Sequence, residues 1–413
     1  MNSRLRILWL KSGPLHPLDT GGKIRTYNMM RELKKKHDIT FLALCLPGVD
    51  ETIKTAAEEY SHQQIWIPWT ETRKRSAGFF FELVGNLVFS NAPYVIQKYF
   101  SRPMANKIRE LDSSHQFDLI VCDFLTPAVN LFARNHVLQT RTLLFQHNVE
   151  SLIWKRLFEN AAGFLKRAYL KNQWGRMEKF ERNTCERCNG VAGVSEDDCR
   201  ILKTQFGLAN VLGWVPTGVD FSYFSPPTEP RKPHSLVFLG SMDWMPNIDA
   251  VLHFAEKSFP AIKAEFTDAT FTIVGRNPTQ QVRDLEKLQN GISVTGTVAD
   301  VRPHLAKAEI MVLPLRVGGG TRIKIYEGMA TGLPIVSSTI GAEGLPVVNR
   351  ENILLADSPE DFVRSIGELF AKGDLRKKIG KNGRDLVVRH FSWQTVTNVF
   401  EQYCLEACAR LKR

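Results

Sequence analysis

The sequence predicts an α/β protein with two Rossmann-like domains, each built on a parallel sheet. Strand-like apolar runs alternate with helix-like segments along the whole chain, and this alternation is typical of parallel sheets. The chain has 413 residues, which is too long for a single core. The alternation stops once, at residues 215–234, where Pro, Gly and charged residues are frequent, as in a linker.

The first half of the chain contains six strand-like runs. Its first helix is expected at about residues 23–36, after Gly21 and Gly22, with Asp19 or Thr20 as the N-cap. The strands are expected at residues 6–10, 39–46, 64–69, 118–124, 142–147 and 191–195. We interpret this half as an N-terminal domain over residues 1–213.

The alternation restarts after the linker and indicates a second domain over residues 214–390. Its strands are expected at residues 235–240, 270–275, 292–296, 310–315, 334–338 and 352–356. Helices are expected to begin near Asn247, Thr279, Asp300, Thr321, Ser358 and Asp374, and a last helix follows at residues 391–413. Ligands of such sheets bind at the carboxyl ends of the strands, and two such domains would face each other across a cleft.

The composition is that of a soluble globular protein, with 43% hydrophobic and 23% charged residues. The formal net charge of +11 favours anionic partners such as phosphates or anionic lipid. The sequence contains no nucleic-acid-binding motif, so a nucleic acid is not expected as a partner. It begins with no signal peptide and contains no apolar run of about 18 residues, so we expect a cytoplasmic protein.

The seven cysteines are expected to be reduced thiols, most of them buried. Cys185, Cys188 and Cys199 have part of the spacing of a zinc site, but they fall in a charged, helix-like stretch with no clear fourth ligand. We therefore expect no bound metal.

Residues 73–94 join a basic cluster to a run of aromatic and aliphatic residues, RKRSAGFFFELVGNLVFSNAPY. The run is too short to span a bilayer. It suits either a helix that lies in a membrane interface or a helix that lines a core or cleft. Together with the positive net charge, the first alternative predicts peripheral contact with an anionic membrane.

A glycine run precedes a predicted helix in the stretch LRVGGGTRIKIYEGMATGLPIVSS. Glycine lets the backbone approach a ligand closely, and a helix N-terminus offers free N–H groups and a positive dipole to phosphate. In a helix over residues 321–331, Glu327 shares a face with Ile323, Tyr326 and Ala330. A carboxylate there is costly to bury unless something binds it. Phosphate at the helix tip and hydroxyl groups at Glu327 together indicate a nucleotide-sugar.

Five stretches resemble, in the expected order, the signatures of one enzyme family. They are TGGKIR (20–25), QHNVES (146–151), VPTGVD (215–220), FLGSMDWMPNIDAV (238–251) and GGGTRIKIYEGMATGLPIVSSTIGAEGL (318–345). By these motifs the chain resembles retaining GT-B glycosyltransferases of the group 1 and family 4 type, nearest to sugar transferases of bacterial exopolysaccharide gene clusters. The resemblance covers almost the whole chain. It implies that the C-terminal helix crosses back to the N-terminal domain.

The resemblance implies that Glu327 hydrogen-bonds the ribose hydroxyls of the nucleotide, the alternative being a helix-surface pair with Lys324. Relatives often carry another glutamate eight positions earlier, where this chain has Gly319. Backbone N–H groups of Gly319, Gly320 and Thr321 are then expected to reach the sugar or phosphate, unless the glycines only form a turn.

The positive charge beside the leaving diphosphate also departs from the family pattern. Many relatives place an Arg after the glycine that corresponds to Gly240, where this chain has Ser241. A leaving diphosphate needs neutralisation in the transition state. Arg322 and Lys324, at the tip of the same helix, are the expected substitutes, the alternative being a solvated helix start.

Further candidates lie at the ends of predicted strands. His147 follows an apolar strand, and the resemblance implies that it contacts the donor sugar rather than serving only the core. The resemblance places Gly21 and Gly22 beside the donor phosphates, although they do not form the G-x-G-x-x-G pattern of dinucleotide folds and a mere turn is the alternative. Glu343 either binds sugar or ribose or caps the next turn, and Asp123 is another strand-end residue.

Together these expectations describe a hexosyltransferase that uses a nucleoside diphosphate sugar, for instance a UDP-sugar. The resemblance implies transfer to a hydroxyl of a glycan or lipid-linked acceptor with retention of configuration, without a metal or other cofactor. The departing phosphate would then help to deprotonate the acceptor. A non-catalytic nucleotide-sugar-binding scaffold of a polysaccharide assembly complex and a sugar-nucleotide epimerase are the alternatives. The sequence does not specify the base, the sugar, the acceptor or the oligomeric state.

Overall fold

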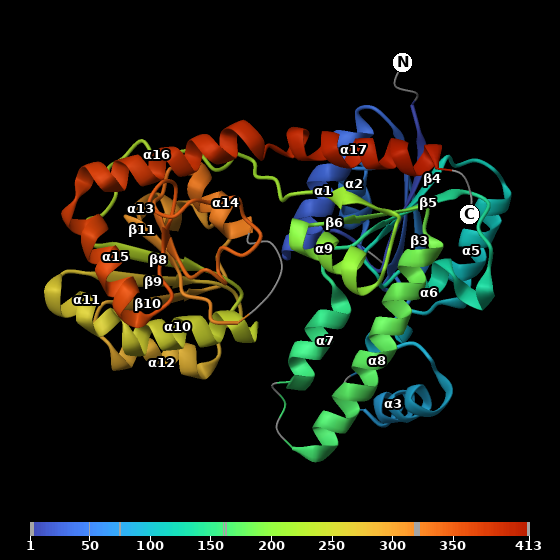
Figure 1. The fold of residues 1–413 in the computed structure, drawn as a ribbon, viewed down its shortest axis with the longest axis horizontal. Helices are drawn as coiled ribbons and strands as arrows, with labels where there is room; N and C mark the ends of the chain where they lie inside the picture. The colour runs from blue at the N-terminus through green and yellow to red at the C-terminus, as the bar shows by residue number, and fades with distance from the viewer. Residues whose placement is uncertain are drawn as a thin grey trace. The chain divides into compact units, whose positions relative to one another are not determined.

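Two parallel sheets, one in each half of the chain, organise the fold (Figure 1). The computed structural model describes residues 4–48, 50–73, 76–159, 161, 163–317 and 323–410, apart from the side chain of Asn135. The chain divides into two units, the first of Met1–Pro216 with Val396–Arg413 and the second of Thr217–Thr395. The boundaries inferred from the sequence, after residues 213 and 390, lie a few residues before these.

The sheet of the first unit has the strand order β3-β2-β1-β4-β5-β6-β7, with all neighbours parallel. Its strands are β1 (Arg6–Lys11), β2 (Asp38–Cys45), β3 (Gln63–Pro68), β4 (Leu119–Asp123), β5 (Arg141–Phe145), β6 (Gly190–Gly193) and β7 (Val211–Trp214). The sequence analysis missed β7. This edge strand has four residues, one of them a glycine, which is too short a pattern to identify a strand.

Helices cover this sheet and extend beyond it. They are α1 (Gly21–Lys34), α2 (Glu51–Ala57), α3 (Ala77–Phe89), α4 (Tyr94–Gln97), α5 (Arg102–Ser113), α6 (Ala128–Leu131), η1 (Ala133–Asn135), α7 (Glu150–Glu159), α8 (Phe164–Arg187) and α9 (Glu196–Gln205). The first helix begins at Gly21, two residues earlier than expected. The hydroxyl of its N-cap, Thr20, accepts a hydrogen bond from the backbone N–H of Lys23 at 3.4 Å.

The last helix, α17 (Trp393–Ala409), brings the end of the chain into the first unit from Val396 onward. The fully buried ring of Phe400 lies 5.6 Å from that of Trp9 and 4.9 Å from that of Phe145, between ring centroids. Glu401 forms an ion pair with Lys36 at 2.5 Å. The core of the first unit therefore includes residues from both ends of the chain.

The sheet of the second unit has the order β10-β9-β8-β11-β12-β13, again with parallel neighbours. Its strands are β8 (Ser235–Leu239), β9 (Thr270–Val274), β10 (Ile292–Gly296), β11 (Ile310–Leu313), β12 (Ile335–Ser337) and β13 (Leu354–Leu355). Its helices are α10 (Met245–Lys257), α11 (Phe259–Glu265), α12 (Gln280–Leu288), α13 (Arg302–Lys307), α14 (Ile323–Ala330), α15 (Pro359–Ala371) and α16 (Gly373–His390). The short α11, which follows α10 after one residue, was not expected from the sequence.

The strand order reverses once in each sheet, between β1 and β4 in the first and between β8 and β11 in the second. In open parallel sheets, ligands bind at the carboxyl ends of the strands at such a reversal, because the flanking connections diverge there and leave a crevice. Each unit therefore has one such position. No helix in the described part of the chain is long and apolar enough to cross a membrane.

Candidate functional site

In the first unit, a buried ion pair lies at the reversal of strand order. Lys11 ends β1 and Asp123 ends β4, so the pairing of these strands brings the two side chains together. Nζ of Lys11 donates to Oδ2 of Asp123 at 2.7 Å, and the lysine is only 8% exposed and the aspartate fully buried. A buried charge of this kind is tolerated only when it is paired and hydrogen-bonded.

The carboxylate of Asp123 is held by three donors on one oxygen. Besides Lys11, Oδ2 accepts from Nε1 of Trp9 at 3.0 Å and from the hydroxyl of Thr26 at 2.7 Å. Burial opposes ionisation of this carboxyl, but the charge of Lys11 and the proximity of His147 outweigh it and lower the pKa of Asp123. Asp123 is therefore a carboxylate at neutral pH.

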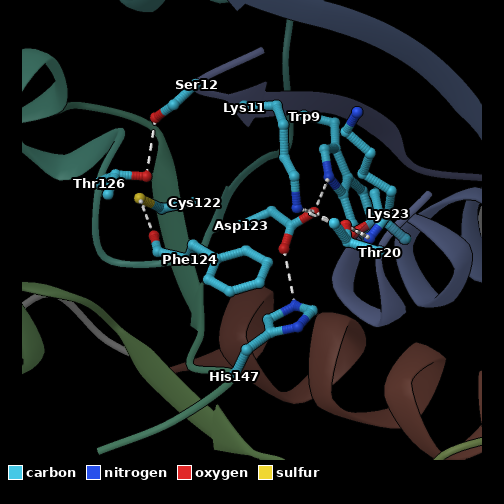
Figure 2. Close-up of polar contacts among 11 residues, drawn as sticks. Trp9, Lys11, Ser12, Thr20, Lys23, Cys122, Asp123, Phe124, Thr126 and His147 are labelled. Atoms are coloured by element: carbon cyan, nitrogen blue, oxygen red, sulfur yellow. Dashed lines mark hydrogen bonds and ion pairs between the residues drawn. The ribbon is translucent and has the colours of Figure 1, made fainter. Parts of the chain in front are cut away.

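His147, two residues after β5, faces the other oxygen of this carboxylate (Figure 2). Its Nε2 lies 2.8 Å from Oδ1 of Asp123. The imidazole stacks on Phe124, with ring centroids 3.7 Å apart, and is 7% exposed. Burial lowers its pKa to about 4 despite the attraction of Asp123, so the ring is neutral at neutral pH.

Gly22 leaves room for the aromatic ring that positions His147. A Cβ atom at Gly22 would lie 2.7 Å from Cζ of Phe124, which is closer than two carbon atoms that are not bonded to each other normally approach. Phe124 itself has φ of 73°, a left-handed conformation that is strained for a bulky residue and is found mainly at functional sites. Gly22 and His147 therefore both lie against Phe124, whereas Gly21 is exposed at the first position of α1.

In the second unit, the side chain of Lys324 extends from α14 to the end of β8, at the reversal of strand order between β8 and β11. From the first turn of α14, its Nζ donates to the carbonyl of Leu239, at the end of β8, at 2.7 Å. It also lies 3.1 Å from Oδ1 of Asn247 and 4.6 Å from the centroid of the Phe238 ring. The ammonium is therefore fixed beside the loop that follows β8.

That loop lies against the loop after β9, and the absence of a side chain at Gly275 makes the approach possible. A Cβ atom at Gly275, after β9, would lie 1.7 Å from the carbonyl oxygen of Gly240, after β8. The same contact brings in Arg276, whose Nε donates to the hydroxyl of Ser241 at 2.9 Å and lies 3.9 Å from Oδ2 of Asp243. Arg276 therefore stands beside the position where the sequence lacks the expected arginine.

Glu327 lies one turn further along α14 and is half-buried. In the described part of the chain, no hydrogen-bond donor binds its carboxyl group. Burial raises the pKa of Glu327 to about 7, and the positive charge of Lys324 only partly offsets this effect. The neighbouring Tyr326 is fully buried, and its ring stacks on that of Phe391 with the ring centroids 4.6 Å apart. This contact fixes the orientation of the helix.

Four predicted site residues, Gly319, Gly320, Thr321 and Arg322, lie outside the described residues. Glu343 is exposed in the loop after β12. That loop is tied to the residues that follow β11, since the hydroxyl of Ser338 donates to the carbonyl of Leu315 at 2.6 Å and accepts from the N–H of Gly341 at 2.9 Å.

The cysteines that resemble part of a zinc site are buried in the first unit. Burial raises the pKa of Cys188 to about 12, so its thiol is protonated at neutral pH. Among the described residues, no three His, Cys, Asp or Glu side chains are grouped as metal ligands.

Each half of the chain matches a family model. Residues 20–223 match Glycosyltransferase Family 4, and residues 233–372 match Glycosyl transferases group 1. The chain is therefore built from two glycosyltransferase domains. The resemblance indicated by the motifs is confirmed at the level of these two families.

A relative of the two glycosyltransferase domains is the "Uncharacterized 44.6 kDa protein in cps region" of Klebsiella pneumoniae. The two chains are 20% identical over 307 residues, which is 72% of this chain and 77% of the relative. Other curated relatives match over 28% to 61% of their own lengths.

Solved glycosyltransferase structures share the fold. A sucrose-phosphate synthase from Thermosynechococcus elongatus superposes with a TM-score of 0.71 at 16% identity, covering 97% of this chain and 98% of the other. HepE from Anabaena, solved in complex with UDP and glucose, gives a TM-score of 0.65 at 14% identity, with coverage of 97% and 99%. The predicted fold class, GT-B with two Rossmann-like domains, is confirmed.

Sequence reasoning missed three residues that the glycosyltransferase domains place beside the candidates. They are Lys11, Phe124 and Arg276. Lys11 and Arg276 both stand at the carboxyl end of a strand, the signal by which Asp123 was noted. Without the strand order, however, nothing in the sequence distinguishes these ends from the ends of other strands.

Proposed function

We propose that the protein is a retaining, metal-independent glycosyltransferase that moves a hexosyl group from a nucleoside diphosphate sugar to a hydroxyl group. This hydroxyl group belongs to a glycan or to a lipid-linked acceptor. The observation that carries the proposal is Glu327, a half-buried carboxyl group without a donor among the described residues, placed on α14 where strand order reverses. Such a group fits ribose hydroxyls, which donate hydrogen bonds to a carboxylate.

In this proposal, the diphosphate lies at the N-terminal end of α14. Lys324 and Arg276 supply fixed positive charge there, and Arg322 adds to it from the predicted start of the helix. Backbone N–H groups of Gly319, Gly320 and Thr321 complete the phosphate site. Catalysis then rests on stabilising the leaving diphosphate in a site that is already organised before the reaction.

The first unit supplies the group that contacts the sugar. His147 is neutral, so it offers the sugar a hydrogen bond without adding charge. Asp123 and Lys11 hold its ring in place and are positioning residues. No protein nucleophile is assigned in this proposal, because the departing phosphate accepts the acceptor's proton on the face from which it leaves.

The choice of donor and pathway rests on relatives. HepE was solved with UDP, which supports a UDP-sugar as donor. The name of the Klebsiella pneumoniae relative places that protein in a cps region, which supports a role in exopolysaccharide or cell-surface glycan synthesis.

Calorimetric titration with UDP, GDP and ADP, in the presence of a chelator, tests the donor site. We expect saturable binding of one nucleotide, weakened at least about tenfold in Glu327→Gln because the neutral amide accepts the ribose hydroxyls less strongly. Glu351→Gln, an exposed residue of the same unit, is the matched control and should bind like wild type. Anomeric analysis of the product then tests retention.

The absence of nucleotide binding by the folded protein would contradict the proposal. Nucleotide binding without transfer to any acceptor and without donor hydrolysis would favour a nucleotide-sugar-binding scaffold instead. The observation that keeps this alternative open is Gly319, where relatives often have a glutamate. Release of an epimerised sugar would identify an epimerase.

A further inference from the structure

An exposed apolar face on α3 is not explained by sugar transfer. The helix contains one charged residue, Glu82. Its outward-facing side chains are exposed to the following extents: Phe80 57%, Phe81 79%, Val84 59%, Val88 65% and Phe89 88%. A surface helix normally turns polar residues to water, so an apolar face of this size indicates a partner that covers it.

The opposite side of α3 is anchored to the first unit, so the apolar face is held in a defined place. Arg176 on α8 donates from Nη1 to the carbonyl of Asn86 and from Nη2 to that of Leu87, both at 2.7 Å. The ring of Phe79 packs edge-to-face on Tyr94, with centroids 5.7 Å apart. The hydroxyl of Tyr94 also donates to the carboxylate of Glu82 at 2.9 Å.

A second apolar cluster lies where α7 ends and α8 begins. Phe164 is 84% exposed, Leu165 81% and Leu157 50%. Figure 1 shows α3 beside the part of α8 that leads to this tip, in agreement with the bonds from Arg176. Along α8, Phe164 and Arg176 are separated by about 18 Å at the rise of an α-helix. The two clusters are therefore near enough to meet one flat surface together.

Positive charge accompanies both clusters. Residues 155–171 contain five basic side chains and one acidic side chain, Glu159. The basic ones, all exposed, are Lys155, Arg156, Lys166, Arg167 and Lys171. In the sequence, the run RKR at residues 73–75 lies one residue before the start of α3. Aromatic side chains flanked by Lys and Arg are the combination that binds the interface of an anionic bilayer.

We propose that α3 and the tip formed by α7 and α8 are a membrane-docking surface. Phe81, Phe89 and Phe164 insert into the interface of an anionic bilayer, while the basic residues contact lipid phosphates. The proposal does not rest on the proposed sugar transfer, because the surface is defined by exposure and charge alone.

Flotation of the full-length protein with lipid vesicles tests this surface. We expect binding to vesicles of phosphatidylcholine with phosphatidylglycerol, much weaker binding to phosphatidylcholine alone, and loss of binding at high salt. Phe81→Ser combined with Phe89→Ser should lower the bound fraction about tenfold or more, since two inserting rings are removed. Val137→Ser with Leu288→Ser is the matched control, because these residues are 81% and 75% exposed elsewhere.

A second variant keeps the test independent of the folding of α3. Lys166→Glu with Lys171→Glu should lower binding to anionic vesicles to a similar extent, while Lys166→Arg with Lys171→Arg should retain it. Wild-type protein that binds neither vesicle, or aromatic and charge variants that both bind like wild type, would overturn the proposal. Light scattering that shows a dimer, converted to a monomer by the aromatic substitutions, would instead assign the surface to a second copy of the chain.

Discussion

At the residue scale, each unit places a lysine ammonium at the reversal of strand order in its sheet. Lys11 ends β1 and pairs with Asp123, and Lys324 bonds the carbonyl at the end of β8. The two differ in their partners. Lys11 forms a buried ion pair with a carboxylate, whereas Lys324 donates to a carbonyl oxygen and an amide oxygen beside the loop after β8. We assign the phosphate to Lys324 because it lies in the first turn of α14 beside the loop after β8, and a positioning role to Lys11 because it is buried against Asp123.

Lys324→Met should therefore lower kcat by roughly a hundredfold, the effect of removing one preorganised stabiliser of transition-state charge. Lys324→Arg should retain part of the activity. The measurement is kcat in parallel with the melting temperature. A variant that turns over at the wild-type rate would remove Lys324 from the mechanism.

Lys11→Met should destabilise the protein by about 3 kcal/mol or more, because it leaves the carboxylate of Asp123 buried without its cation. Adding Asp123→Asn should recover part of this loss, because the amide carries no charge to bury. Urea unfolding of the single and double variants measures the coupling. If the two substitutions changed the free energy of unfolding additively, the ion pair between Lys11 and Asp123 would not be what stabilises this buried cluster.

Nucleotide affinity should rise with pH through the pKa of Glu327. The empty protein holds this pKa at about 7, above the ordinary value of 4.5, because burial favours the neutral acid. Below this pH the group is mostly protonated and accepts ribose hydroxyls poorly. Calorimetry from about pH 6 to about pH 8 should show affinity increasing by no more than about tenfold per pH unit. The dependence should be flatter in Glu327→Gln.

The same shift has the opposite sign for stability of the empty protein. The folded state keeps a proton on Glu327 between pH 4.5 and about 7 that the unfolded chain has lost. The contribution of Glu327 to the free energy of unfolding is therefore fully present below pH 4.5 and is lost as the pH rises through about 7. This contribution can be isolated by comparing the free energies of unfolding of the wild type and Glu327→Gln across this pH window.

At the scale of elements, close contacts between loops build the proposed phosphate site of the second unit. The loop after β8 and the loop after β9 meet through Gly240 and Gly275, and this contact brings Arg276 to Ser241. A side chain at Gly275 would separate the loops, and a side chain at Gly240 would collide with Phe238 and Asn247. In the proposed site, an arginine from a neighbouring strand end thus stands beside Ser241, where many relatives carry their own arginine.

Gly275→Ala should destabilise the second unit by about 1–3 kcal/mol, because the new Cβ would lie 1.7 Å from a backbone oxygen that cannot move aside alone. It should also weaken nucleotide binding by displacing Arg276. Gly367→Ala, whose Cβ would meet no atom closer than 3.8 Å, is the control and should be neutral or slightly stabilising. Thermal unfolding and nucleotide titration of both variants measure the difference.

At the scale of the whole molecule, the chain leaves its first unit at Pro216 and returns to it at Val396. The second unit is therefore inserted in the sequence of the first. The aromatic cluster of Trp9, Phe145 and Phe400 joins the two segments of the first unit. The stability of that unit consequently depends on residues that lie beyond the other unit in the sequence.

Phe400→Ala should cost about 3–5 kcal/mol of stability, the usual effect of removing a buried aromatic ring. The loss should appear in the first unit only. Calorimetry with and without nucleotide distinguishes the units, because the nucleotide stabilises the second. Gln402→Ala, at an exposed position of the same helix, should change nothing measurable. Equal destabilisation of both transitions would show that the two units unfold together.

The sequence by itself determined the fold class, the family and the positions along the chain of twelve of the thirteen strands that the described residues form, because these depend on local apolar periodicity and on contiguous motifs. It also indicated Glu327 and His147, since each stands in a recognisable stretch. Short elements such as β7 and α11 escaped it, because a few residues carry no period.

Only the tertiary structure decided which strand ends are neighbours. Lys11 and Asp123 are more than one hundred residues apart, and Arg276 and Ser241 are thirty-five apart. Their contacts follow from the order of strands in the sheets, which no local pattern encodes. The same holds for the exposed face of α3, because the sequence of this helix suits a core as well as a surface. Burial is a property of what surrounds a segment, so the sequence left that choice open and the structure resolved it.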